Sequence, residues 1–226
     1  MPSYQTNDKA WISIDDGATK LKGMNDHTPP KITRNSIEIV EYGMEVDSEA
    51  PTSAKWDQGS VSGNRVKTDT TGQNAVIAAL VANTALTSFR MYDDANDFRT
   101  VDLAKDPESV YSIMGYDPGN YDKAGLAKFS ATVLLQGMQA HYMSHLTADT
   151  IAVVPDAGGD TITDSGLGFV DAGFEVGMSV FIVNGSDREG AIIKTVEAGT
   201  LTMETKDVLT AITAGSTVQV HGGYTG

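Results

Sequence analysis

The chain has 226 residues, with 16 Lys and Arg against 30 Asp and Glu, and therefore carries a formal net charge of −14. This acidity argues against a sequence-specific DNA reader or a binder of anionic membranes, and the absence of Cys excludes disulfides, thiolate nucleophiles and cysteine-ligated zinc. Because the longest apolar run, residues 75–82, has only eight residues, we expect a soluble chain without a membrane or targeting segment.

The first predicted elements are short strands. Residues 11–14 and 19–24 flank the turn signal Asp15-Asp16-Gly17, which predicts a β-hairpin. Apolar and polar residues alternate over residues 36–42, which predicts a strand with one side facing solvent. Residues 61–67 predict another strand.

The segment from Gly43 to Lys55 follows neither pattern. It has no sustained period and too few apolar residues to pack by itself, so we expect a long irregular loop. Two interpretations fit this loop: a solvated surface segment, and an arm that becomes ordered against a neighbouring molecule.

One helix is predicted after these strands. Thr70 or Thr71 is the expected N-cap, because hydroxyl side chains accept hydrogen bonds from the first free backbone N–H groups. The apolar spacing that follows indicates one buried face. Its predicted members are Val76, Ile77, Leu80, Val81 and Thr84.

More strands are predicted after the helix. Phe89–Tyr92 and Phe98–Asp102 flank one polar turn, and Glu108–Tyr116 and Ala127–Tyr142 flank another. In the last of these segments the apolar alternation shifts by one residue at Gly137. The shift predicts a β-bulge at that glycine.

Composition divides the chain between Leu146 and Asp149. Residues 149–226 hold 3 basic and 11 acidic residues and only 4 of the 16 aromatic residues. Their strand signals, separated by turns, are Thr150–Val154, Thr161–Thr163, Ser179–Val183, Ala191–Val196, Leu201–Thr205 and Thr217–His221. We therefore predict two domains, residues 1–147 and 148–226, of which the second is a small all-β barrel or sandwich.

The sequence contains little that indicates chemistry at a site. No P-loop, G-x-S-x-G elbow or H-E-x-x-H motif occurs, and although any two acids could meet in a cleft as a hydrolase pair, no pair stands out. His141 and His145 have the spacing of a helical metal site but fall in a predicted strand. The acidic clusters at residues 93–97 and 156–164 lack the downstream Glu of a helix-loop-helix calcium site, so we expect solvated turn acids. We predict no enzyme, no cofactor and no metal.

The order of these signals resembles that of siphophage major tail tube proteins, a family shared with related phage-like particles. The matching segments are Ile32–Ile39, Trp56–Gly63, Thr71–Ala75, Phe89–Asp94, Val110–Tyr116 and Lys128–Gly137. Each pattern is loose, and their order along the chain is the specific feature. Residues 149–226 are an addition to a minimal family member, and their segments 173–178 and 184–186 resemble small β modules appended to several virion proteins.

The resemblance implies a mainly β fold, a tail-tube-type β-sandwich with one flanking α-helix, followed by the small all-β domain. It implies homohexameric rings that stack into a tube in the virion tail, after assembly in the host cytoplasm. The implied partners are further copies of the chain and the tail terminator, tape measure and distal tail proteins. Double-stranded genome DNA would pass through without specific binding, which suits an acidic wall because such a wall repels DNA.

The resemblance also assigns roles to individual residues. The strand over residues 36–42 matches part of the sheet that lines the lumen, so Glu38 and Glu41 are predicted lumen acids; the alternative is that they solvate an outer face. The loop 43–55 would contact the next ring. Its candidate contact residues are Glu45, Val46, Asp47, Glu49 and Pro51.

A different class of function stays open at this point. The alternative is a tail-associated receptor- or glycan-binding adhesin, in which Phe169, Phe174 and Phe181 would form a sugar-binding platform, although three Phe in a small β module more often form its core. In the tube interpretation we expect the second domain on the exterior, because a bulky module would block a channel of DNA size.

Overall fold

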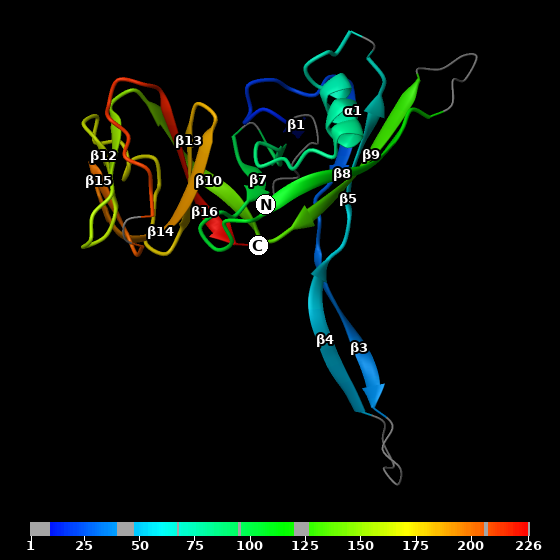
Figure 1. Ribbon diagram of the computed structural model, residues 1–226, viewed down its shortest axis with the longest axis horizontal. Helices are drawn as coiled ribbons and strands as arrows, with labels where there is room; N and C mark the ends of the chain where they lie inside the picture. Colours follow the sequence, from blue (N-terminus) through cyan, green and yellow to red (C-terminus); the bar gives the residue numbers. More distant parts are fainter. Residues whose placement is uncertain are drawn as a thin grey trace, which may run out of the picture.

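A computed structural model describes residues 10–39, 48–66, 68–94, 96–119, 127–205 and 208–225, with the backbone alone over residues 34–39 and 48–54. These residues form three antiparallel sheets and one helix (Figure 1). The predicted mainly β fold class is therefore confirmed. Over the same residues, no helix combines the length and apolar character needed to cross a bilayer.

Two sheets face each other in the N-terminal half and enclose its core. One sheet has four strands in the order β2 (Met24–Thr28), β5 (Gly59–Asn64), β9 (Lys128–Gln136) and β8 (Val110–Asp117). The facing layer consists of β1 (Trp11–Ser13), β6 (Arg90–Tyr92), β7 (Phe98–Val101) and β10 (Gln139–Ala148). Alternate residues of both layers, such as Phe129 and Val133 on β9 and Met91 on β6, belong to one buried apolar cluster.

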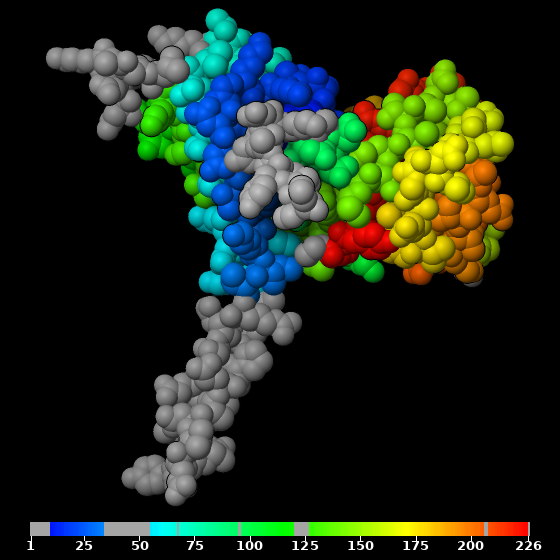
Figure 2. Space-filling view, turned by 180° about the vertical axis from the view of Figure 1, so that it is seen from behind, coloured from blue at the N-terminus to red at the C-terminus, as the bar shows by residue number. Residues whose placement is uncertain are grey.

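The second layer continues into the C-terminal half without a break. Strand β10 pairs with β7 along one edge and with β16 (Val218–Thr225) along the other. The sheet then runs through β13 (Ser179–Asn184), β14 (Asp187–Glu197), β15 (Thr200–Met203), β12 (Thr161–Asp164) and β11 (Ile151–Val154), for ten strands in all. Figure 2 shows the red surface of the last strand between the blue and the yellow-orange lobes. The division predicted after residue 147 thus falls at the end of β10, inside this shared sheet.

The C-terminal half contains a second buried apolar cluster. Phe169 and Phe174 belong to it, with their rings edge to face and their centroids 5.5 Å apart. Phe181 packs instead into the N-terminal cluster. The exposed platform considered for these three side chains is wrong, because none of them is more than 4% exposed.

The predicted helix is confirmed as α1 (Gln73–Ala82), but neither Thr70 nor Thr71 caps it. The fully buried carboxylate of Asp69 accepts hydrogen bonds from the backbone N–H groups of Gly72 and Gln73, at 3.1 and 3.0 Å. A carboxylate inside the fold thus satisfies the free donors that a surface threonine was expected to satisfy.

The buried face of α1 is narrower than its apolar spacing predicts. Its buried residues are Gln73, Val76 and Ala79. Val81, which was expected in the buried face, is 81% exposed. The helix contacts β8, and a narrow stripe that includes Val76 and Ala79 packs onto the core. The opposite side of this apolar helix therefore faces away from the core.

Gly137 marks the point where the chain crosses from one sheet to the other. The predicted single bulged strand over residues 127–142 is wrong, because β9 ends at Gln136 in the four-stranded sheet and β10 begins at Gln139 in the ten-stranded sheet. Gly137 has a φ of +96°, and a Cβ added there would lie 2.2 Å from Oγ of Ser109. The shift in alternation arises because each strand turns its own apolar side toward the shared core.

The hairpin predicted around residues 15–17 is also wrong. Strand β1 pairs with β6, with Trp11 opposite Tyr92, and β2 pairs with β5. Residues 15–17 still form a turn, in which Asp16 and Gly17 have positive φ. The distant partner is preferred because it places Ile12 in the core, where this side chain is fully buried.

Replacing Gly137 by Ala is expected to lower the free energy of unfolding by about 3 kcal/mol, because the methyl group would overlap Ser109 in a backbone conformation that favours glycine. Chemical denaturation followed by circular dichroism measures this loss. The matched control is Gly185→Ala, where φ is +61° and an added Cβ meets no described atom within 4 Å. We expect a loss of about 1 kcal/mol for the control. Equal losses for the two variants would contradict the overlap.

Candidate functional site

The hairpin formed by β3 (Ile32–Ile39) and β4 (Ser48–Trp56) is the candidate assembly surface. Among the described strands, these two pair only with each other, and they project away from the body of the molecule (Figure 1). The irregular loop predicted over residues 43–55 is therefore wrong for residues 48–55, which belong to β4. A strand of a two-stranded ribbon does not require apolar alternation, so the sequence pattern contained no signal for it.

The residues predicted for assembly fall on this hairpin or outside the described residues. Glu38 on β3 lies opposite Glu49 on β4, and Ser36 lies opposite Pro51. The candidates outside the described residues are Glu41, Glu45, Val46 and Asp47. The structure thus brings Glu38, predicted to line the lumen, onto the same ribbon as Glu49 and Pro51, predicted to contact the next ring. The roles of all these residues remain predictions.

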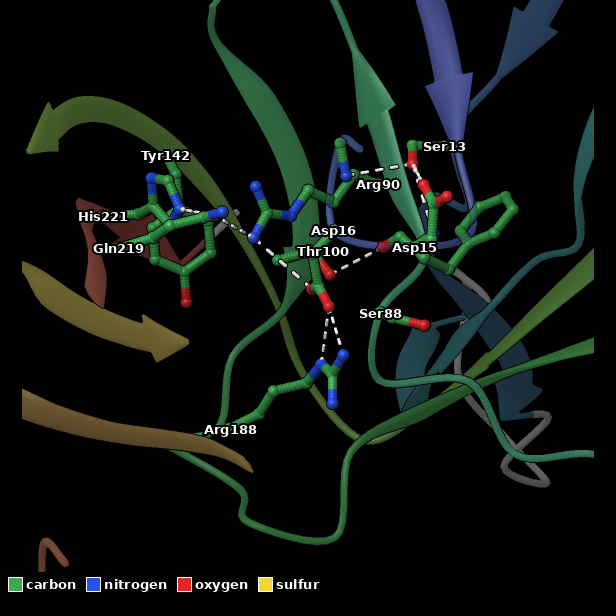
Figure 3. A network of polar contacts seen from close by, with 12 residues as sticks. Ser13, Asp15, Asp16, Ser88, Arg90, Thr100, Tyr142, Arg188, Gln219 and His221 are labelled. Atoms are coloured by element: carbon green, nitrogen blue, oxygen red, sulfur yellow. Dashed lines mark hydrogen bonds and ion pairs between the residues drawn. The ribbon is translucent and has the colours of Figure 1, made fainter. Parts of the chain in front are cut away.

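A second polar site joins the two halves of the molecule at Asp16 (Figure 3). Arg188 on β14 donates hydrogen bonds to Oδ2 of Asp16, from Nε at 2.9 Å and also from Nη2. Nη2 of Arg90 on β6 lies 3.4 Å from Oδ1 of the same carboxylate. One carboxylate, 9% exposed in its side chain, therefore holds one guanidinium group from the sandwich and one from the C-terminal unit.

Arg90 is the buried charge of this site. It is 2% exposed, and its guanidinium lies 4.4 Å from the ring centroid of Phe98. Nη1 donates to the hydroxyl oxygen of Tyr92 at 3.4 Å, and Nη2 donates to Oε1 of Gln219 on β16 at 3.1 Å. Because these partners come from two halves of the sheet, Arg90 ties β6 to the last strand. A buried charge that loses such a partner is strongly destabilising.

An open hollow of about 610 Å³ lies beside this network, lined in part by Trp11, Arg90 and Tyr92. The ring of Trp11 stacks on Tyr92 with centroids 3.7 Å apart, and the ammonium group of Lys20 lies 4.7 Å from the Trp11 ring centroid. Tyr92 and Lys20 already engage this indole, so we do not assign it as a sugar-stacking platform. The hollow lies at the boundary between the two halves, and both halves contribute residues to its lining.

Three of the four histidines in the chain face the carboxylate of either Asp93 or Asp97. Nε2 of His27 and Nε2 of His141 lie 3.8 and 3.4 Å from the two carboxylate oxygens of Asp93. Nε2 of His145 lies 3.6 Å from Oδ1 of Asp97. The pair that the sequence singled out, His141 and His145, therefore faces two different carboxylates. Burial opposes ionisation of Asp93, yet its contacts with His27 and with an arginine lower the pKa of this carboxyl.

The fourth histidine, His221 on β16, contacts His145 through their Nδ1 atoms, which lie 2.9 Å apart. Burial lowers the pKa of His221 well below its usual value, and the nearby charge of Arg90 adds to this effect. Burial also lowers the pKa of His145, although Asp97 opposes the shift. Both rings are therefore neutral at pH 7.

The other acidic residues that the sequence singled out brace loops. Asp160 is fully buried and accepts hydrogen bonds from the backbone N–H groups of Val208 and Leu209, both at 2.9 Å. Asp164 accepts hydrogen bonds from two glycine N–H groups at 3.0 Å. The expectation of solvated turn acids is wrong for these two residues, because the folded loops enclose them as acceptors. Across the described part of the chain, no three His, Asp or Glu residues are grouped so that they could hold a metal ion.

Sequence reasoning missed the residues of the Asp16 site. Arg90 stands within the apolar segment Phe89–Tyr92, and a charge in such a segment is the one signal that could have indicated a buried cation. Asp16 lies in a polar turn and Arg188 lies on β14, 172 positions later, so no local pattern connects them.

Asp16→Asn is expected to lower the free energy of unfolding by about 3 kcal/mol, because it leaves the buried guanidinium of Arg90 without its carboxylate partner. Urea denaturation measures this change. Asp187→Asn is the matched control, since it removes one exposed carboxylate next to Arg188, and we expect a change within about 0.5 kcal/mol. A loss no larger than that of the control would show that the Asp16 site does not hold the halves together.

Acidification from about pH 7.5 to about pH 5.5 is expected to destabilise the fold through His145 and His221. Their folded-state pKa values lie below the ordinary value of 6.5, so the unfolded chain binds more protons once the pH falls below 6.5. Their contribution is complete above that pH and is lost below it, by up to about 1.4 kcal/mol per pH unit for each ring. Denaturation at several pH values measures the slope.

The variant His221→Gln serves to test the origin of this slope. The free energy of unfolding of this variant should change less with pH than that of the wild type, whatever its absolute value, because one of the two buried rings is gone. Carboxyl groups with lowered pKa values, such as Asp15 and Asp164, lose their contribution only below their ordinary value of 3.8 and do not interfere. An unchanged slope would assign the pH dependence to other groups.

No protein-family model and no curated protein matches this sequence. Among solved structures, a chain from the virion of a native gene transfer agent particle is 10% identical, with a TM-score of 0.44, over 61% of this chain and 98% of that one. A type six secretion system protein is 9% identical, with a TM-score of 0.32, over 70% and 95%. The Dit protein (gp 19.1) of phage SPP1, a hub adsorption apparatus protein, is 10% identical, with a TM-score of 0.40, over 96% and 99%. Because none of these TM-scores reaches 0.5, the function of this chain has to be argued from its own residues and geometry.

Proposed function

We propose that this chain is a structural protein of a phage-type tail, a major tail tube subunit whose copies form rings of six that stack into a tube. The β3–β4 hairpin carries the proposal, because it is a two-stranded ribbon that leaves the body and pairs with no other described strand. The order of sequence signals along residues 32–137 supports the same role. No reaction and no cofactor belongs to this proposal.

A projecting ribbon needs a partner to be stable. An isolated two-stranded ribbon is at best marginally stable in water, and each outer edge presents unpaired backbone donors and acceptors. An edge strand of a neighbouring copy would satisfy these groups along β4, which has nine residues. Head-to-tail contact of this kind propagates into an open stack when its rotation does not close on itself. We assign the contact with the next ring to the hairpin and to Glu45, Val46, Asp47, Glu49 and Pro51.

The charge of the chain suits the passage of DNA. A net charge of −14 per copy gives an acidic ring, and an acidic wall repels DNA and allows no binding through release of counterions. Glu38 and Glu41 are the proposed lumen acids. Because Glu38 lies on β3, we place this part of the acidic lining at the hairpins.

The C-terminal unit, residues 148–226, is proposed to lie on the outside of the tube. The ten-stranded sheet makes it a rigid extension of the sandwich, and a lobe of that size inside a channel would block the path of DNA. The proposed partners are further copies of the chain and the tail terminator, tape measure and distal tail proteins. The proposed location is the virion tail, and the host cytoplasm during assembly.

Removal of the hairpin is expected to abolish tube formation. The variant joins Thr33 directly to its register partner Lys55 through an Asn-Gly turn, which suits a two-residue hairpin connection. Wild-type protein should form rings or tubes in negative-stain micrographs, and the variant should stay dispersed while circular dichroism shows a folded body.

The control inserts Gly-Ser after Gly185, in the exposed turn between β13 and β14, and it should form tubes as the wild type does. Tubes of normal length without the hairpin would refute the proposed role of the hairpin. If wild-type protein instead remains a small closed oligomer and binds a glycan array, the adhesin alternative is correct.

A further inference from the structure

Arg90 determines the orientation of the Gln219 amide. A guanidinium group can only donate hydrogen bonds, so the Gln219 atom that lies 3.1 Å from Nη2 of Arg90 is the carbonyl oxygen Oε1. The same oxygen lies 3.1 Å from Nε2 of His221. Because an amide oxygen only accepts hydrogen bonds, His221 carries its proton on Nε2.

The proton on His221 determines the position of the proton on the next ring. Since the ring of His221 is neutral, its Nδ1 has a lone pair and accepts a hydrogen bond. Nδ1 of His145 lies 2.9 Å away, and two ring nitrogens at this distance need one proton between them. His145 therefore donates from Nδ1, and in its neutral form it has no proton on Nε2.

The remaining nitrogen of His145 faces a carboxylate. Its Nε2 lies 3.6 Å from Oδ1 of Asp97, and it is buried without a hydrogen-bond partner among the described residues. When the ring is neutral, two acceptors therefore face each other at this position and repel. When Nε2 takes a proton from solvent, it can donate to Asp97 while the bond from Nδ1 to His221 is kept.

We propose that His145 and Asp97 form a proton-operated latch. Protonation of His145 at Nε2 adds a hydrogen bond from β10 to Asp97, in the turn between β6 and β7, while the contacts through His221 and Gln219 to β16 are kept; loss of the proton removes this added bond. The latch rests on the geometry around His145 and does not depend on the proposed tail function.

Charged and titratable groups approach His145 from each element packed against it. Burial opposes the charged ring most strongly, Asp97 and Asp94 in the turn favour it, and the charge of Arg90 on β6 opposes it. Two further groups of charges lie beyond these direct neighbours of His145. One is Asp93 with its partners Arg99, His27 and His141, and the other is Asp16 with Arg188. Because burial dominates, the ring of His145 is neutral at pH 7 and the latch is open; it closes on acidification. The closed turn gains a hydrogen bond even though the fold as a whole loses stability in acid.

Nitrogen NMR of the histidine rings in the ¹⁵N-labelled full chain tests the latch directly, because it distinguishes Nδ1–H, Nε2–H and doubly protonated rings. At about pH 7.5 we expect His221 protonated on Nε2 and His145 protonated on Nδ1. As the pH falls, His145 should gain its second proton on Nε2 while His221 stays neutral. A neutral His145 that carries its proton on Nε2 would overturn the proposal, whatever the variants do.

The variant Asp97→Asn tests the partner. It should lower the pKa of His145 further, because the carboxylate that favours the charged ring is gone. In the wild type, hydrogen-exchange protection of the turn amides, corrected for the intrinsic effect of pH, should rise as His145 gains its second proton. In the variant it should not.

Asp93→Asn is the matched control, since it removes the same charge from the same turn but on the side of His27 and His141. It should leave the tautomer and the titration of His145 nearly unchanged. An unshifted His145 pKa in Asp97→Asn, or equal shifts in the two variants, would overturn the assignment of Asp97.

Discussion

The pairing of β10 with two different strands is the interaction on which the rest of the structure depends. Residues Gln139–Tyr142 pair with β7 of the sandwich, and residues Ala140–Ala148 pair with β16 of the C-terminal unit. One strand therefore supplies backbone hydrogen bonds to both halves, so the two apolar clusters lie along one continuous sheet. The close approach needs glycine on the partner strand, because a Cβ on Gly223 would lie 2.0 Å from the carbonyl oxygen of His141. The sheet connection makes the C-terminal unit an extension of the sandwich instead of a module on a flexible linker.

Two buried charged side chains, Asp16 and Arg90, lie at the same seam. Asp16 holds Arg188 from one half and Arg90 from the other, and Arg90 reaches on to Gln219. Such a network contributes less to stability than its Coulomb attraction suggests, because each group has lost its hydration. The network contributes mainly by fixing positions. Planar guanidinium groups and one carboxylate fit together in a single arrangement, which aligns β6, β14 and β16. The same fixed arrangement orients the amide of Gln219 and, through it, the two neighbouring histidine rings.

The projecting hairpin differs from the seam because the outer edges of its strands have no partner among the described strands. In the body of the protein, strands pair with one another within two larger sheets. In contrast, β3 and β4 leave the body and pair only with each other among the described strands. The outer edges of such a ribbon present unpaired backbone N–H and C=O groups. A strand of a neighbouring molecule can pair with these groups without a specific apolar pocket. A rigid body with one extended ribbon is what an assembling subunit needs, because the body sets the spacing of copies and the ribbon bridges them.

The sequence by itself determined the class of the fold and the position of most strands. Alternation and turn residues placed the six C-terminal strands and the helix close to their observed positions, because these signals depend only on which side of a local element faces a core. It did not determine strand partners: β1 with β6, the sheet crossing at Gly137 and the β3–β4 ribbon all follow from pairings that local patterns do not encode. The site at Asp16 and the histidines around residues 93–97 were likewise decided by the tertiary structure alone. Their members are distant in sequence, and they meet because the ten-stranded sheet joins both halves of the molecule while His27 reaches Asp93 from β2 of the four-stranded sheet.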